Sequence, residues 1–300
     1  MLSYKNRNTF LQGLHPLTVT LIIITYLILF LKFKNPLYFV CVLASLLTIA
    51  YLDGCLKEVM GYAKIMMPFA VGIMILNPLL VHNGDTILYQ GYLNIPVLGK
   101  IIITKEAILY GVFNGLRMVS ITALFGFGNL IVHPDRTFGY FAKYIKRSSL
   151  LMSMTIRLFP TMMKSYENIL EIEKLRCNSI LKDGMKNKIK GSGNIANILF
   201  LSSLEDSEDM AESMYSRGYG ALNRRSSYFR EKYTIWDFVI IVISIEIFIY
   251  LYYFTVNGFN EFNFYNKVDN VLLKTSREGI ILCVGTYLIA LINWWWKIWK

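Results

Sequence analysis

Residues 235–256 read Ile-Trp-Asp-Phe-Val-Ile-Ile-Val-Ile-Ser-Ile-Glu-Ile-Phe-Ile-Tyr-Leu-Tyr-Tyr-Phe-Thr-Val, an apolar run with Glu246 near its middle. A helix needs about 20 mostly apolar residues to span the hydrocarbon core of a bilayer, so this run is long enough to cross a membrane. Two further runs reach that length, Ala107–Val132 and Gly279–Ile298. The fold is therefore expected to be built on membrane-spanning helices.

Three shorter apolar runs precede these: Pro16–Leu31, Pro36–Leu52 and Met66–Val81. The first two are separated by four residues and predict a tight helical hairpin, with a proline at the first turn of each helix, where its missing N–H costs nothing. A short β-hairpin is expected within Asn83–Gly99, where turn residues gather. Together the runs predict an all-α polytopic membrane protein with about six transmembrane helices.

The composition agrees with a membrane protein. Of the 300 residues 55% are hydrophobic and 17% are charged, against roughly 45–50% and about 25% in soluble domains. These values exclude a disordered, collagenous or disulfide-rich chain. The four cysteines and three histidines are scattered, so neither a disulfide framework nor a metal site is expected.

The charges divide the chain into three regions. Residues 132–232 hold 28 of its 51 charged residues, which predicts membrane regions at 1–131 and 233–300 around one polar, basic segment. Lysine and arginine favour the cytoplasmic side of a membrane. With the N-terminus inside, and with only the flanks of the long segment counted, the inner side holds 14 cations and the outer side seven. Both termini and residues 132–232 are therefore expected in the cytoplasm.

The polar segment predicts two amphipathic helices. The first covers Ser149–Leu181, with Pro160 as a kink or break near its start, and the second covers roughly Ser203–Arg217. The basic stretch 186–193 between them is expected to be a surface loop that favours the anionic inner leaflet. Acidic residues occupy the start of the second helix, and Gly218 stands just past its end, which suits the helix dipole and a left-handed C-cap.

Each of these helices ends in an arginine, in Leu175-Arg176-Cys177 and in Ser216-Arg217-Gly218. The pair resembles the cytoplasmic coupling helices of the T component of energy-coupling factor (ECF) transporters, the EcfT/CbiQ-like family, whose helices end in Ala-Arg-Gly-like motifs. The second copy is the closer match, because Cys177 replaces the usual glycine in the first. His15 and Pro16 lie in a stretch similar to a Leu-Asp-Pro-Arg-Thr motif of that family, and Pro160 also fits.

The resemblance implies an all-α membrane scaffold with coupling helices and without catalytic residues of its own. It would join two cytoplasmic ABC ATPases, which bind the ATP, to a small membrane subunit that binds a vitamin or a metal ion such as cobalt. The implied ATPase-coupling residues are Leu175, Arg176, Cys177, Ser216, Arg217 and Gly218. In agreement, the sequence has no phosphate-binding loop and no other enzyme motif that we recognise, so no cofactor is expected in the chain. The tryptophan-rich C-terminus predicts an interfacial anchor and not a nucleic-acid site.

Arg117 and Glu246 are charged residues that fall well inside predicted spans, away from the span ends. Charges inside a membrane are usually paired or face a polar cavity. The favoured interpretation is an Arg117–Glu246 pair that joins two helices. The alternative is a polar site in a transport path, which would make the chain a secondary transporter, and a membrane-embedded enzyme is the third possibility. We find no inverted repeats in the sequence, which would support a secondary transporter. We also find no convergent acid–base set, which would support an enzyme.

Overall fold

The computed structural model describes residues 7, 9–81, 86–95, 99–133, 136–137, 140, 146–175, 185–221, 232–259, 262–264 and 276–299. The chain divides into two compact units, each considered by itself. Residues 1–133 and 232–300 form the first, here named the membrane unit. Residues 134–231 form the second, here named the two-helix unit.

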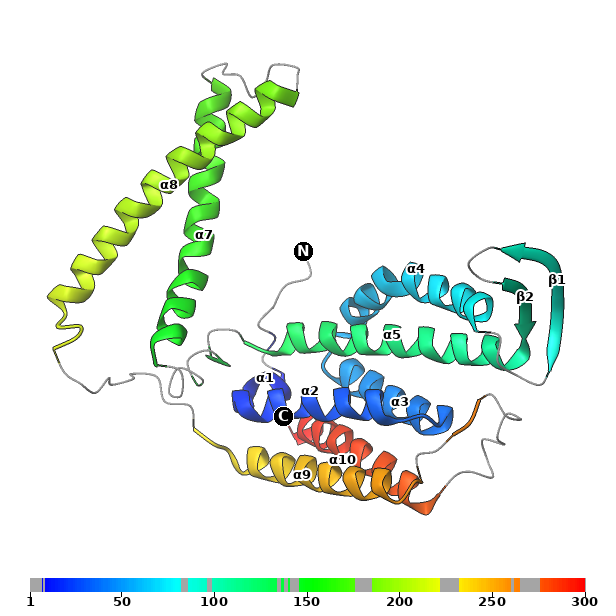
Figure 1. The fold of residues 1–300 in the computed structure, drawn as a ribbon. Coiled ribbons are helices and arrows are strands. Elements are labelled where there is room, and N and C mark those ends of the chain that lie inside the picture. The colour runs from blue at the N-terminus through cyan, green and yellow to red at the C-terminus, as the bar shows by residue number, and fades with distance from the viewer. Residues whose placement is uncertain are drawn as a thin grey trace. The chain divides into compact units, whose positions relative to one another are not determined.

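The membrane unit is a bundle of helices that lie side by side (Figure 1). Helix α2 packs against α5 and α9, α10 packs against α3 and α9, and α4 packs mainly against α5. The helices are α1 (Phe10–Gly13), α2 (Pro16–Lys32), α3 (Pro36–Leu52), α4 (Leu56–Leu80), α5 (Lys105–Ile131), α9 (Ile235–Val256) and α10 (Arg277–Trp299). This confirms the all-α membrane fold.

Helices α4, α5, α9 and α10 are long and apolar enough to cross a membrane, whereas α2 and α3 have 17 residues each. The prediction of a short third segment is wrong, because α4 begins at Leu56, ten residues before Met66. Its first turns carry charged residues that lower the hydropathy but do not stop a helix. One of them, Glu58, finds an ion-pair partner in Arg7.

An antiparallel β-hairpin connects α4 to α5. Its strands are β1 (Ile87–Ile95) and β2 (Gly99–Thr104), and Ile87 lies opposite Thr104. The predicted hairpin within Asn83–Gly99 therefore forms, but it begins and ends a few residues later in the chain.

The helix starts follow their sequence signals. Pro16 and Pro36 occupy the first turns of α2 and α3, as predicted. The preceding residues are the N-caps: the side chains of His15 and Asn35 each accept a hydrogen bond from the backbone N–H two residues on. Such caps satisfy donors that a helix leaves unpaired in its first turn.

Aromatic side chains and glycines set the spacing of the bundle. Tyr38 and Phe254 are fully buried, with ring centroids 5.9 Å apart. A Cβ at Gly279 would lie 2.2 Å from the ring of Tyr38, and one at Gly126 would lie 2.5 Å from the ring of Tyr62. Glycine thus lets neighbouring helices approach closely.

The two-helix unit consists of α7 (Lys146–Leu175) and α8 (Met185–Ser216), which pack against each other. Helix α7 runs through Pro160 as one element. The prediction of a loop over 186–193 is wrong, because α8 already begins at Met185. Lysine is a good helix former, and an interior glycine costs only about 1 kcal/mol. Helix α8 buries Gly191 and Ile195, so packing can offset that cost.

Candidate functional site

The end of α8 is a well-formed helix cap. Gly218 has a φ of 75°, its N–H donates to the carbonyl of Tyr215, and the N–H of Tyr219 donates to the carbonyl of Met214. This pair of bonds defines a Schellman motif, in which a left-handed residue satisfies the last carbonyls of a helix. The predicted left-handed cap at Gly218 is confirmed. Arg217 is the C-cap residue and projects from a fixed backbone.

The surroundings of Arg217 are open. Arg217 is exposed, Tyr215 and Tyr219 beside it are 83% and 51% exposed, and no atom lies within 4 Å of the position of a Cβ on Gly218. The hydroxyl of Ser216 donates back to the carbonyl of Ser213 at 3.0 Å. Gly218 is therefore needed for its positive φ, and the surface around Arg217 can accept another molecule.

The corresponding end of α7 is described as far as Leu175, which is 83% exposed. Arg176 and Cys177 lie outside the described residues. Pro160 is exposed within α7, and the neighbouring Phe159 is 63% exposed. Of the predicted coupling residues, the structure therefore describes Leu175, Ser216, Arg217 and Gly218.

The predicted motif at His15 and Pro16 adjoins a carboxylate that sequence reasoning missed. Asp237 is fully buried at the start of α9. Its Oδ1 accepts hydrogen bonds from the backbone N–H of His15 at 2.7 Å and from Oγ1 of Thr18 at 2.9 Å. Its Oδ2 accepts from the N–H of Thr234 at 2.8 Å. The spacing Thr234-x-x-Asp237, typical of a capping box, was the available signal.

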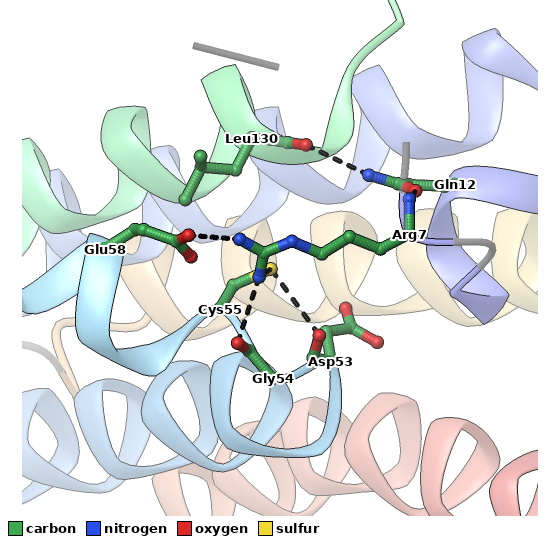
Figure 2. A network of polar contacts seen from close by, with 7 residues as sticks. All are labelled: Arg7, Gln12, Asp53, Gly54, Cys55, Glu58 and Leu130. Carbon is green, nitrogen blue, oxygen red and sulfur yellow. Dashed lines mark hydrogen bonds and ion pairs between the residues drawn. The ribbon is translucent and has the colours of Figure 1, made fainter. Parts of the chain in front are cut away.

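A second polar network ties the N-terminal residues to the α3–α4 turn (Figure 2). Arg7 forms an ion pair with Glu58 and donates to the carbonyl of Gly54 at 2.9 Å and to Sγ of Cys55 at 3.1 Å. The hydrogen bond with Glu58 raises the pKa of the Arg7 guanidinium above its usual value, and burial raises the pKa of the Cys55 thiol. Arg7 therefore stays charged and fixes this turn.

The same turn contains a buried acid, Asp53. Its Oδ1 accepts a hydrogen bond from Nδ2 of Asn293 on α10 at 3.1 Å. Burial raises the pKa of the Asp53 carboxyl to about 6, although this hydrogen bond and the positive charges of Lys297 and Arg7 oppose the rise. Asp53 is thus a titratable contact between α3 and α10.

Arg117 and Glu246 do not pair, so the favoured interpretation of these two residues is wrong. Arg117 donates to the carbonyl of Phe33 at 2.8 Å, and its guanidinium lies 4.7 Å from the ring centroid of Phe113. Glu246 is exposed on α9. Phe33 is the C-cap of α2, where a cation meets the negative end of the helix dipole. Arg117 therefore binds a helix end and not a carboxylate, although its buried Nε has no hydrogen-bond partner.

Nothing in the described part of the chain gathers three or more metal-ligating side chains, and the polar groups above hold helices together. The arrangement can position an arginine at a capped helix end and anchor helices to one another. Such an arrangement is suited to binding and to mechanical connection.

Comparisons with known proteins bear on this arrangement. The family model CbiQ, cobalt transport protein, matches residues 8–228. A protein of Staphylococcus aureus (strain 04-02981), named energy-coupling factor transporter transmembrane protein EcfT, is 26% identical over 271 residues, covering 85% of this chain and 96% of that protein. The protein of the same name from Macrococcus caseolyticus (strain JCSC5402) is 22% identical over 227 residues, covering 72% and 80%. The chain therefore belongs to the CbiQ family, as its resemblance to ECF T components predicted.

Proposed function

We propose that this chain is the transmembrane scaffold of an ECF-type importer, in which it couples ATP hydrolysis by two partner ATPases to uptake through a separate substrate-binding membrane subunit. The observation that carries the proposal is the exposed Arg217 on the Schellman cap of α8, in a chain of the CbiQ family. Relatives named as ECF transmembrane proteins support it.

Arg217 suits the contact with an ATPase. A guanidinium presents a planar set of donors that binds a carboxylate through two parallel hydrogen bonds. The cap fixes the backbone under Arg217, so less entropy is lost when its side chain binds. Arg176, at the end of the first predicted coupling helix, is proposed to make the equivalent contact with the second ATPase.

The proposed partners have separate functions. The two cytoplasmic ATPases bind and hydrolyse ATP, and this chain holds no cofactor. A small membrane subunit binds the substrate, a vitamin or a metal ion. The description of the CbiQ family as cobalt transport proteins supports a metal ion, whereas the EcfT names leave the substrate open.

The proposed orientation places the two-helix unit and both termini in the cytoplasm of a multi-pass cell-membrane protein. Figure 1 places α1 and the last turn of α10 at the same end of the bundle. There Arg7 binds the α3–α4 turn, and Nζ of Lys297 donates to the carbonyl of Leu52 at 2.9 Å. The chain leaves for the two-helix unit after α5 and returns before α9 at this same end, and cations favour the cytoplasmic side.

Affinity purification of the full-length chain from its native membrane in mild detergent tests the proposal. Two ATPase subunits should co-purify with the wild-type chain, and ATP hydrolysis should follow the complex through size exclusion. A double variant, Arg176→Ala with Arg217→Ala, should lose the ATPases and elute later than the complex, as a single species that is not aggregated. Purification of the wild-type chain without any ATPase, at normal expression and with detergents that preserve the bundle, would refute the scaffold role.

A further inference from the structure

The chain passes between its two units at two places, after the end of α5 at Ile131 and before the start of α9 at Ile235. One short N-terminal segment contacts both the end of α5 and the start of α9, where these two passages meet the membrane unit. This segment, residues 7–18, covers α1 and the first residues of α2 and is here named the N-terminal clamp. Its contacts at the two passages use different side chains.

At the outgoing passage, the clamp contacts the last turn of α5. Nε2 of Gln12, a buried residue, donates to the carbonyl of Leu130 at 3.2 Å. Carbonyls in the last turn of a helix have no partner within the helix, so this bond caps α5. Oε1 of Gln12 in turn accepts from the N–H of Arg7 at 2.8 Å, and Arg7 binds Glu58 on α4. The end of α5 is thereby tied to the start of α4 (Figure 2).

At the returning passage, Asp237 holds the clamp. One carboxylate oxygen accepts from His15 and Thr18 at the start of α2, and the other accepts from Thr234 at the start of α9. One buried carboxylate thus caps two helices at once, and the positive ends of both helix dipoles favour its charge. The ring of His15 also stacks on that of Tyr233, with centroids 4.0 Å apart. Tyr233 lies directly beside the passage.

We propose that Asp237 is a positioning residue for coupling, because it links the returning chain to the N-terminal clamp and so transmits movement of the two-helix unit to the membrane bundle. The inference rests on the proposed coupling function. It extends that function from the ATPase contact at Arg217 to the point where the bundle receives the movement. A buried, multiply bonded carboxylate suits this role, since pulling on α9 must carry α2 with it or break the two hydrogen bonds from His15 and Thr18.

Two variants separate this role from simple stability. In Asp237→Asn the amide nitrogen cannot accept a hydrogen bond, so the residue can cap α2 or α9 but not both. Thr18→Val is nearly isosteric and removes one hydroxyl that reaches Asp237, while Thr18→Ser retains it. Thr25→Val is the matched control: Thr25 is equally buried on α2, but its hydroxyl donates only to Leu21 within the same helix.

The experiment measures two distances by electron paramagnetic resonance in the complex with its ATPases in nanodiscs. Spin labels carried by a non-cysteine unnatural amino acid, which leaves Cys55 and Cys177 in place, stand either at Leu151 and Phe200, exposed on α7 and α8, or at Ile75 and Tyr252, exposed on α4 and α9. In the parent protein, ATP should shift both distances. In Asp237→Asn and Thr18→Val the α7–α8 shift should persist while most of the α4–α9 shift is lost. Thr18→Ser and Thr25→Val should behave as the parent.

The outcomes distinguish the two proposals. If no ATPase binds the parent protein, the coupling function itself fails. If ATPases bind and the α7–α8 distance responds, but the α4–α9 shift is absent from the parent or survives in both Asp237→Asn and Thr18→Val, the role of Asp237 is overturned. Equal loss of the shift in Thr25→Val would also overturn it, because the effect would then follow from any polar deletion in α2.

Discussion

The membrane unit and the two-helix unit differ in how much apolar side chain they bury. The membrane unit has a continuous core in which Tyr26, Phe33, Tyr38 and Phe254 are fully buried or nearly so. In the described part of the two-helix unit, Ile195 is the one buried hydrophobic side chain, while Phe159, Phe200 and other large apolar residues are exposed. The first unit is stabilised by its own packing, whereas the second leaves most of its described apolar and charged side chains exposed.

The polar residues show the same contrast. In the membrane unit, Asp237 and Arg117 hold helix ends of the same chain. In the two-helix unit, Arg217 stands exposed on a cap that its own backbone completes. The burial of a polar residue is therefore not enough to identify it as functional in this chain. An exposed arginine on a rigid cap is better suited to a partner than one that already binds a helix end of its own chain.

The largest expected effect comes from a matched pair of phenylalanine deletions. Phe254→Ala should lower the stability of the membrane unit by about 3–5 kcal/mol, because a fully buried ring leaves a cavity between Phe33 and Tyr38. Phe200→Ala, at 61% exposure on α8, should change stability by about 0.5 kcal/mol or less. Thermal unfolding in detergent measures both. Equal losses for the two variants would break the contrast between the units.

Next in size is a pH effect at Asp53. Its folded-state pKa of about 6 exceeds its ordinary value of 3.8, so the folded chain holds this proton more tightly than the unfolded chain. The resulting stabilisation is fully present below pH 4 and is lost as the pH rises through 6.

In Asp53→Asn a non-titrating amide replaces the carboxyl, so this pH-dependent stabilisation is absent. Its stability relative to the wild type should therefore rise by on the order of 2–3 kcal/mol between pH 4 and pH 7. Unfolding curves recorded across this range test the sign and the window. A difference between the two proteins that stays constant over the range would show that Asp53 is not the buried acid described here.

The smallest stability effects come from adding one methyl group in each unit. Gly279→Ala should destabilise by about 1–3 kcal/mol, because the new Cβ meets the buried ring of Tyr38. Gly193→Ala on α8 meets no atom within 4 Å and should stabilise that helix by about 0.5–1 kcal/mol. Unfolding of the membrane unit and helix content of α8 by circular dichroism report the two effects. A stability change of the same sign in both variants would contradict the contrast between the two units.

Much of this molecule could be predicted from local sequence. Long apolar runs predict the membrane helices, because a helix forms all the backbone hydrogen bonds that lipid cannot provide within a single segment. The cap at Gly218 was predictable because its chemistry involves neighbouring residues. Helix α8 was predicted too short, since the lysines and glycines of 186–193 look like a loop until the burial of Ile195 against a neighbour is known.

The contacts that hold distant segments together could not be predicted in this way. Asp237 lies 222 residues from His15, and its spacing to Thr234 suggests only a local cap. Arg117 binds a backbone carbonyl, an acceptor that every residue carries, so the sequence offers no partner to recognise. Glu246 was chosen as that partner for its charge, and its exposure on α9 shows that charge alone does not establish proximity.

The central claim is that Arg217 binds an ATPase, and the affinity of the purified chain for its ATPases tests it most directly. Arg217→Ala should weaken binding by about tenfold or more, because a charge-assisted contact contributes roughly 1.5–3 kcal/mol. Arg217→Lys should restore little of this affinity, since lysine lacks the bidentate fork. Lys164→Ala, an exposed cation within α7, should bind as the wild type does. Wild-type affinity in Arg217→Ala would contradict the account.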